Sequence, residues 1–419
     1  MTGNNARYDL SDRLIHFFRA VDPGHGDTPL LPDHWGFASI ETWDDPFSPF
    51  FLMRNAVRQG RLWATWSVRS ERRTIYGPDP AVCFTDMPIA AFVEAGLARA
   101  ARGEAMSPYG LVLPKRAMFA AGARPVIYAL SGDVSVTNRA DGARLIASYQ
   151  LPLAEQYRYV TYDPTAPRPI DWTHEREWRW PLRDAPPPDP EMEGLPPAID
   201  DLHGLELDDP RLAGLGAIVK TSRQAEQLIY DILTKIDRGD IDETQYDFVL
   251  ALDAVGNIAD LRDRAALEQA IDAARIDLSS FFQVRKARGK AVKAEVVQLV
   301  RSVEAGAGPP EFGEFGGCWL WITDTTHEVT RALLREGEIT VTQVGKYLLD
   351  LHEFSDQRGM RQRQDMTLEL ARRLEARFGL TATYLSVLGK DDPDAVPFYN
   401  GDELDNEKFY NYSNNENDY

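Results

Sequence analysis

Short apolar runs between polar, glycine- and proline-rich segments predict an α+β fold with many short strands in the N-terminal part of the chain. The strand-length runs, rich in aromatic and β-branched residues, are residues 14–18, 62–68, 81–85, 110–113, 125–130, 157–161 and 175–181. Helices are predicted at residues 50–59, which Gly60 closes, and at residues 88–102, which begin with proline. Because few helices separate the strands, we expect a mixed or antiparallel sheet and not a doubly wound one.

A segment crowded with proline, aspartate and glutamate interrupts this pattern at residues 183–210 and is typical of a surface loop. The alternation of elements resumes after it, with a strand predicted at 216–221, an amphipathic helix at 223–236 and a strand at 248–254. We therefore predict an N-terminal domain over residues 1–258 that contains this Pro-rich loop.

The remainder of the chain predicts a helical connector and a small C-terminal α/β domain. Residues 261–302 are strongly helical with a break near Gly289, and residues 305–317 form a hinge, so the connector is placed at 259–310. The domain at 311–400 is expected to contain strands at 318–322 and 382–387, and helices at 326–335, 341–350 and 365–378. Residues 401–419 form an acidic tail.

Composition restricts the compartment and the partners. The chain has 419 residues, a formal charge of −19 and two cysteines, Cys83 and Cys318, and it shows no signal segment and no apolar run that could span a membrane. These features predict a soluble cytoplasmic protein, and the charge opposes long-range attraction to nucleic acid. One dense basic cluster could still contact phosphates or form a solvated helix face: Arg285, Lys286, Arg288, Lys290 and Lys293.

The common phosphate-binding, zinc-protease and hydrolase motifs do not occur in the sequence, and no acidic cluster suggests a nuclease. Asp324, His327, His352 and Glu353 could in principle bind a metal, but they lack cysteine partners and regular spacing. We interpret Asp324 or Thr325 as a helix cap and the histidines as exposed, so no metal site is predicted.

The strongest chemical pattern is the segment Trp-Thr-His-Glu-Arg-Glu-Trp-Arg-Trp at residues 172–180. On a strand, alternation places Glu175, Glu177 and Arg179 on one face and the tryptophans on the other. This pattern fits a catalytic carboxylate pair, and it also fits an edge strand with a solvated charged face and a Trp-lined core face.

Further segments accompany this one in a fixed order. They are His16 in an early apolar strand, Tyr76-Gly77, Phe-Thr-Asp-Met-Pro at 84–88, Tyr109-Gly110, Ala-Arg-Pro-Val-Ile-Tyr at 123–128 and Trp-x-x-Glu-x-Glu-Trp-Arg at 172–179. In this order the segments resemble the bacterial abortive-infection AbiGi-type proteins, which are similar to the DarT ADP-ribosyltransferases. The resemblance covers about residues 8–255.

The resemblance implies a split β-sheet cleft of the ADP-ribosyltransferase type that takes NAD as a substrate, with Glu177 as the catalytic residue. A carboxylate near the ribose would stabilise the oxocarbenium-like state formed as the nicotinamide bond breaks. Glu175 would position or deprotonate the acceptor.

The resemblance also implies residues that hold NAD. His16 would bond a ribose hydroxyl, and Tyr76 or Tyr109 would stack on the nicotinamide. Arg19 or Arg69 would hold the pyrophosphate, because a guanidinium matches phosphate oxygens. The alternative interpretation places the histidine and both tyrosines in the protein core.

These inferences predict an ADP-ribosyltransferase-like effector of bacterial phage defence or of a toxin–antitoxin system, which modifies a nucleic acid or a protein. The alternative is a non-catalytic interaction protein, an antitoxin or sensor, that holds a partner in the same cleft. Residues 316–327, 384–389 and 396–400 resemble a recurrent bacterial module of unknown function, which implies no activity.

Overall fold

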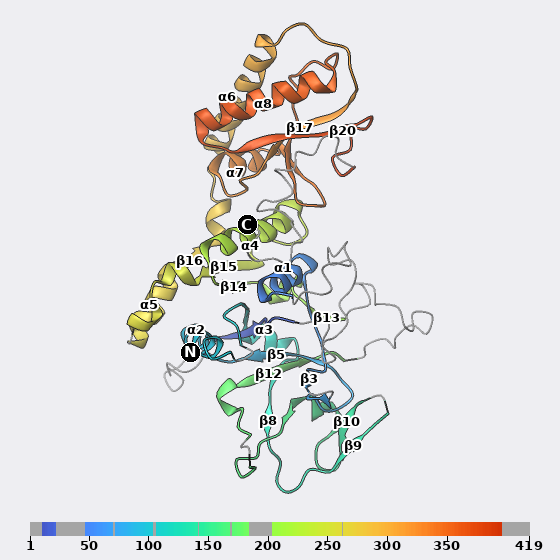
Figure 1. The fold of residues 1–419 in the computed structure, drawn as a ribbon, viewed down its shortest axis with the longest axis vertical. Coiled ribbons are helices and arrows are strands. Elements are labelled where there is room, and N and C mark those ends of the chain that lie inside the picture. Colours follow the sequence, from blue (N-terminus) through green and yellow to red (C-terminus); the bar gives the residue numbers. More distant parts are fainter. Residues whose placement is uncertain are drawn as a thin grey trace. The chain divides into compact units, whose positions relative to one another are not determined.

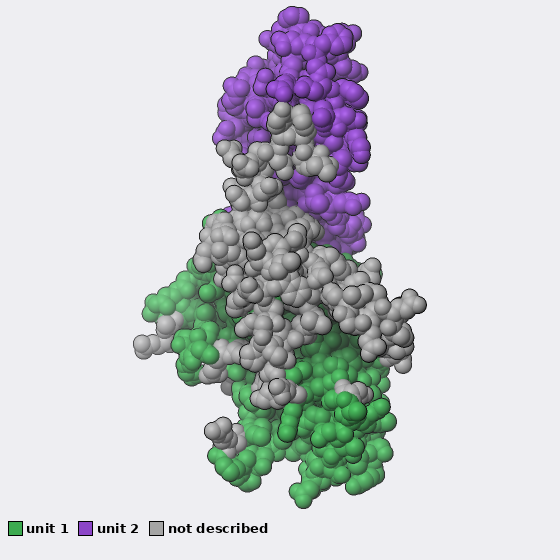
Figure 2. Space-filling model, turned by 45° about the vertical axis from the view of Figure 1, so that its right-hand side comes forward, with its two compact units in different colours: residues 1–225, 244–276, 412–417 green, residues 226–243, 277–411, 418–419 purple. Residues whose placement is uncertain are grey.

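The computed structural model describes residues 11–21, 47–69, 72–103, 106–140, 142–167, 170–183, 203–261 and 263–395. Within these residues the chain forms two compact units, coloured separately in Figure 2. Unit 1 takes residues up to 225 together with 244–276, and unit 2 takes residues 226–243 together with the chain from 277 onward. The predicted boundary near 258 therefore lies inside the second stretch of unit 1, and the predicted connector is divided between the units. The predicted acidic tail lies outside the described residues.

Unit 1 is built on an eight-stranded sheet in the order β16-β15-β14-β6-β1-β5-β12-β7 (Figure 1). Its strands are β1 (Arg13–Phe17), β5 (Ala81–Thr85), β6 (Gly110–Pro114), β7 (Arg124–Pro125), β12 (Glu177–Pro181), β14 (Leu215–Val219), β15 (Tyr246–Ala251) and β16 (Arg275–Asp277). The pair β14–β15 is parallel, whereas the pairs that join β14, β6, β1, β5, β12 and β7 are antiparallel. The predicted α+β class with a mixed sheet is confirmed.

The α-helices that lie wholly within the described residues of unit 1 are α1 (Pro49–Gln59), α2 (Ile89–Ala100), α3 (Lys115–Ala120) and α5 (Arg264–Ala274). Helix α1 begins where Ser48 Oγ accepts a hydrogen bond from the amide of Phe51 at 3.1 Å, and it ends at Gly60, whose φ of 65° suits glycine. Helices α2 and α5 cover one sheet face, on which Phe92 and Ile271 share a buried cluster with Ile15 of β1.

Short strand pairs surround the main sheet. They are β2 (Arg61–Trp63) with β13 (Gly204–Glu206), β3 (Val68–Arg69) with β4 (Arg72–Arg73), β8 (Ile127–Tyr128) with β11 (Tyr159–Val160), and β9 (Val136–Asn138) with β10 (Arg144–Ile146). The continuous strands predicted at 62–68 and 125–130 are wrong, because Ser67 and Ala129 adopt positive φ angles that interrupt extended backbone. The predicted strand 157–161 is shorter in the structure: its first two residues belong to a 3-10 helix, Leu153–Arg158, and only β11 is extended. Strand β13 lies within the predicted Pro-rich loop, most of which is outside the described residues.

Unit 2 contains a four-stranded sheet in the order β18-β19-β17-β20. Its elements are α6 (Lys286–Gly306), β17 (Gly316–Ile322), α7 (Glu328–Arg335), β18 (Ile339–Val341), β19 (Tyr347–Leu349), α8 (Met360–Phe378) and β20 (Ala382–Leu388), and most of α4 (Ser222–Arg238) belongs to it. In β17, both the tryptophans Trp319 and Trp321 and the alternating Leu320 and Ile322 are buried, so both faces of this strand are covered.

One prediction for this part of the chain is wrong and another is displaced. The helix predicted at 341–350 is a β-hairpin, in which Val341 pairs with Tyr347 and Gly345 takes a φ of 83° in the turn. The break predicted near Gly289 in the helical stretch 261–302 lies before this glycine, between the end of α5 and the start of α6, and Gly289 itself is within α6. A β-carbon there would lie 2.7 Å from Oε1 of Glu336, so the glycine permits close packing rather than a turn.

No helix among the described residues has the length and the apolar character needed to cross a membrane.

Candidate functional site

Glu177 begins β12 and is held by an arginine on the same strand face. Arg179 Nε donates to Glu177 Oε1 at 2.7 Å, and Arg179 NH1 donates to the carbonyl of Tyr157 at 2.6 Å. The Arg179 side chain is 6% exposed and that of Glu177 is 15% exposed. The pair is therefore a largely desolvated, charge-assisted contact in which a carboxylate keeps limited access to solvent.

Glu175 does not lie on this strand, so the predicted alternation that joined it to Glu177 is wrong. It ends a 3-10 helix, Thr173–Glu175, and Arg176 follows with a φ of 48°, which breaks the extended backbone. The carboxylate of Glu175 instead accepts from Arg99 NH1 of α2 at 3.1 Å. Arg99 was not predicted as a site residue, because nothing in the local sequence connects it with a carboxylate 76 residues away.

His16 lies at the point where β1 and β5 separate. The two strands pair through one residue pair, Ile15 with Thr85. Immediately beyond this pair, Nδ1 of His16 lies 2.9 Å from the carbonyl oxygen of Cys83. Since a carbonyl only accepts, Nδ1 carries the proton, and Nε2 keeps its lone pair when the ring is neutral. Burial lowers the pKa of His16 to about 4, so the ring is neutral at physiological pH.

The strand register places Glu177 and His16 on different sheet faces. Glu177 and Ile15 both lie opposite Thr85, so these three side chains share a face. The ring of His16 packs edge-on against Phe84, the next residue along β5, with 5.8 Å between ring centroids. His16 and Glu177 are thus on the two strands that flank β5, and their side chains lie on opposite faces of the sheet.

Two further side chains surround Glu177. The hydroxyl of Tyr128 accepts from the amide of Glu177 at 3.3 Å and donates to the carbonyl of Trp172 at 3.1 Å, which fixes the start of β12. Burial, and then the charge of Glu177, raises the pKa of Cys83 to about 12. Cys83 therefore stays a thiol at neutral pH, which excludes it as a thiolate nucleophile.

Tyr76 and Tyr109 are both buried. Tyr76 belongs to a small apolar cluster with Ile146, and its ring lies under the guanidinium of Arg144 at 4.1 Å. The hydroxyl of Tyr109 lies 3.0 Å from Nε2 of Gln224. Both tyrosines thus have partners within the fold, as the core interpretation expects.

The structure gives fewer details for Arg19 and Arg69, the two arginines predicted to hold a pyrophosphate. Arg19 is exposed and follows β1. Arg69 ends β3, and its side chain lies outside the described part of the structure.

The basic cluster lies at the start of α6 and is partly neutralised. Arg288 Nε lies 2.7 Å from Glu328 Oε1, and Lys293 forms an ion pair with Glu338. Arg285, Lys286 and Lys290 are exposed.

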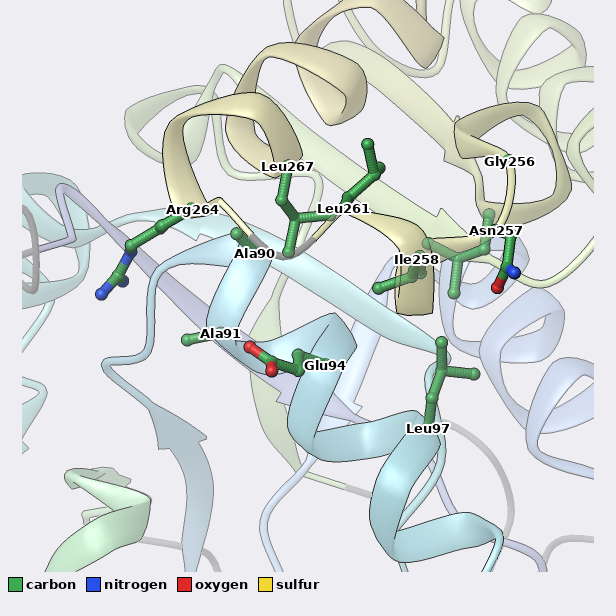
Figure 3. Close-up of a pocket in the computed structure, with 11 residues that line it drawn as sticks. Ala90, Ala91, Glu94, Leu97, Gly256, Asn257, Ile258, Leu261, Arg264 and Leu267 are labelled. Atoms are coloured by element: carbon green, nitrogen blue, oxygen red, sulfur yellow. The ribbon is translucent and has the colours of Figure 1, made fainter.

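A cavity of about 710 Å³ lies in unit 1 between α2 and residues 252–267 (Figure 3). Its lining is mostly apolar: Ala90, Ala91, Glu94, Leu97, Leu252, Gly256, Asn257, Ile258, Leu261, Arg264 and Leu267. Arg264 extends its guanidinium away from the apolar side chains, and it pairs with Glu268 at 3.3 Å. None of the predicted site residues lines this cavity.

Among the described residues, no group of three or more His, Cys, Asp or Glu side chains is arranged to hold a metal ion. The cap of α7 is His327, whose Nδ1 accepts from the amide of Val329 at 3.2 Å, and not Asp324 or Thr325 as interpreted from the sequence. Oδ1 of Asp324 accepts from the amides of Thr326 and His327, each at 3.1 Å, in the turn before the helix.

Comparison with known proteins identifies one family. Residues 289–412 match a family described as a protein of unknown function, DUF4427. The match covers the part of the chain in which a module of unknown function was expected. No curated protein and no solved structure matches the chain.

Proposed function

We propose that unit 1 is an ADP-ribosyltransferase-like enzyme that takes NAD as a substrate and uses Glu177 as the catalytic carboxylate. The observation that carries this proposal is the state of Glu177. It is a carboxylate at the start of β12, between β5 and the edge strand β7, and it is largely desolvated and fixed by Arg179, yet 15% exposed. A fixed carboxylate in a largely water-excluded position stabilises developing positive charge more strongly than one in water.

The chemistry that this carboxylate suits is cleavage of a glycosidic bond. When the bond from ribose to nicotinamide breaks, the nicotinamide leaves with the bonding electrons and the ribose carbon becomes oxocarbenium-like. Glu177 would stabilise that cation, and the acceptor nucleophile would then bond to the same carbon and lose its proton. Glu175, held by Arg99 on the neighbouring helix, is the second carboxylate near the start of β12.

His16 takes a positioning role in this proposal. Its neutral ring, with Nδ1–H donated to the carbonyl of Cys83, offers Nε2 as an acceptor for a ribose hydroxyl. The separation of β1 from β5 after a single residue pair supports the split sheet that the family resemblance implies. Because the register puts His16 and Glu177 on different sheet faces, a bound dinucleotide would have to pass through the region where the strands part.

The proposed context is an effector of phage defence or of a toxin–antitoxin system, acting on a nucleic acid or a protein. The test is incubation of the purified full chain with NAD labelled on the adenylate phosphate and with bacterial RNA, DNA and protein in separate reactions. Transfer of label to one class of acceptor, lost in Glu177→Gln, supports the proposal. NAD binding without transfer or nicotinamide release would favour the non-catalytic interaction protein.

A further inference from the structure

The segment that joins α6 to β17 (Figure 1) carries a doubled Glu-Phe-Gly triplet, and both of its phenylalanines are exposed. Residues 311–316 read Glu-Phe-Gly-Glu-Phe-Gly. Phe312 is 102% exposed, the highest value among large hydrophobic side chains in the described residues, and Phe315 is 75% exposed. Large aromatic side chains in such positions are characteristic of surfaces that bind another protein.

The backbone of this segment is fixed by helix α8. The amide of Gly359 donates to the carbonyl of Glu311 at 2.8 Å, and the amide of Met360 donates to the carbonyl of Glu314 at 2.7 Å. These amides open a helix and have no partner within it, so the segment satisfies them. The phenylalanines are therefore presented by an ordered backbone, which lowers the entropy lost when a partner binds.

Glycines make this arrangement possible at the end of the segment. A β-carbon on Gly316 would lie 2.0 Å from the carbonyl oxygen of Val387, so no larger residue fits. The neighbouring amide of Gly389 donates to the carbonyl of Phe315 at 2.8 Å. Backbone hydrogen bonds thus hold the second triplet at the end of β20, as they hold the segment at the start of α8.

The surroundings of the two rings define the chemistry of the partner. Leu388, paired with Gly316 across the sheet, is 46% exposed and extends the apolar surface. Glu311 and Glu314 lie beside the rings in the sequence, and Glu314 also pairs with Arg361, whose Nε lies 3.6 Å from Oε2 of Glu314. A symmetric contact between two such segments would bring like charges together, so the complementary surface must be apolar and positively charged.

Helix α3 in unit 1 carries a surface of that kind. Phe119 is 51% exposed, and the guanidinium of Arg124 lies 3.9 Å from its ring centroid. Arg116, on the same helix, is exposed. The two surfaces have opposite charge and similar aromatic content, which is the complementarity that two binding surfaces require.

We propose that residues 311–316 of one chain dock on the α3 surface, Phe119 with Arg116 and Arg124, of a second copy of the same chain. The contact joins different surfaces of the two copies, so it produces either a closed assembly, from a reciprocal dimer to a larger ring, or an open array. This proposal is independent of the enzymatic function proposed above.

The test is the mass of the purified full chain by sedimentation velocity between about 1 and 100 μM, the range of moderate protein affinities. The wild type is expected to gain mass with concentration. Phe312→Ser with Phe315→Ser should weaken association by at least about 30-fold, since buried aromatic anchors dominate binding. Tyr149→Ser removes another exposed aromatic side chain, 85% exposed, and should leave the association unchanged.

Charge reversal tests the pairing itself and does not depend on the aromatic variants. Glu311→Arg and Arg116→Glu should each weaken association when studied alone, while an equimolar mixture of the two should associate. In the mixture the two reversed residues have opposite charges, and the unchanged Glu311 of one variant can meet the unchanged Arg116 of the other. A wild type that stays monomeric throughout the range would overturn the proposal. Wild-type-like association of the double variant Phe312→Ser/Phe315→Ser, or of Arg116→Glu, would also overturn it. The same holds if the equimolar mixture associates no more strongly than either charge variant alone.

Discussion

The buried ion pair Arg331–Asp237 gives the sharpest prediction about unit 2. Arg331 NH1 and NH2 donate to the two oxygens of Asp237 at 2.6 and 2.9 Å, and each side chain is 5% exposed. Tyr347 also donates to Asp237, at 2.8 Å. Asp237 belongs to α4, outside the residues 289–412 that match the family, yet the contact lies in the core of unit 2.

Replacement of Arg331 by methionine should strongly destabilise this unit. The substitution roughly preserves volume but leaves Asp237 buried without its cation, and breaking a buried pair from one side costs about 3–5 kcal/mol. Because each 1.4 kcal/mol is a factor of ten, amides that exchange through opening of unit 2 should lose about 10²- to 4 × 10³-fold protection. The expected losses lie in peptides from α4 and β17 together.

The assay is hydrogen exchange followed by mass spectrometry on the full chain, which separates the two units as fluorescence of nine tryptophans cannot. Arg372→Met is the matched control, because Arg372 is 71% exposed and pairs with Glu369 on the same helix. It should change stability by no more than about 0.5 kcal/mol. Equal protection in Arg331→Met and Arg372→Met, or losses confined to β17, would refute the reasoning.

Two further predictions concern single residues. Burial lowers the pKa of His16 from 6.5 to about 4, so the unfolded chain binds a proton at this histidine more tightly than the folded chain does. The contribution of the neutral His16 to stability is therefore present above pH 6.5 and is lost as the pH falls to 4. Denaturant titrations of the wild type should therefore lose up to about 3 kcal/mol more than His16→Gln over this interval, and parallel curves would contradict the assignment. Gly316→Ala should destabilise unit 2 by about 1–3 kcal/mol or more, because the added carbon clashes with the carbonyl oxygen of Val387. In the control Gly308→Ala no atom lies within 4 Å of the added carbon, so its melting temperature should stay near that of the wild type. Equal melting temperatures of the two variants would show that the β20 edge can move.

Elements whose ends carry a local signal could be predicted from the sequence. The apolar run that became β1, the serine- and glycine-bounded helix α1 and the apolar β17 all occur where predicted, because local pattern and tertiary packing agree there. The predicted strand at 175–181 began too early because Arg176, a non-glycine residue, adopts a positive φ that no local rule indicates.

The arrangement of charged partners could not be predicted. Arg99 meets Glu175 across 76 residues and Asp237 meets Arg331 across 94, and such pairs depend on the folded topology. The hairpin at β18 and β19 was mistaken for a helix because its apolar residues also suit a helical spacing, which short segments do not resolve.

The central claim is that Glu177 catalyses cleavage of NAD. The most direct measurement is the rate of nicotinamide release from saturating NAD, with the acceptor mixture present, by the wild type and by Glu177→Gln. Glu155→Gln is the control, because Glu155 is likewise paired with an arginine close in the sequence, Arg158, which lies three residues further along the same 3-10 helix. The account predicts release by the wild type and by Glu155→Gln, and a loss of about 10²- to 10³-fold in Glu177→Gln. Equal rates in all three proteins, or no release from the wild type, would contradict it.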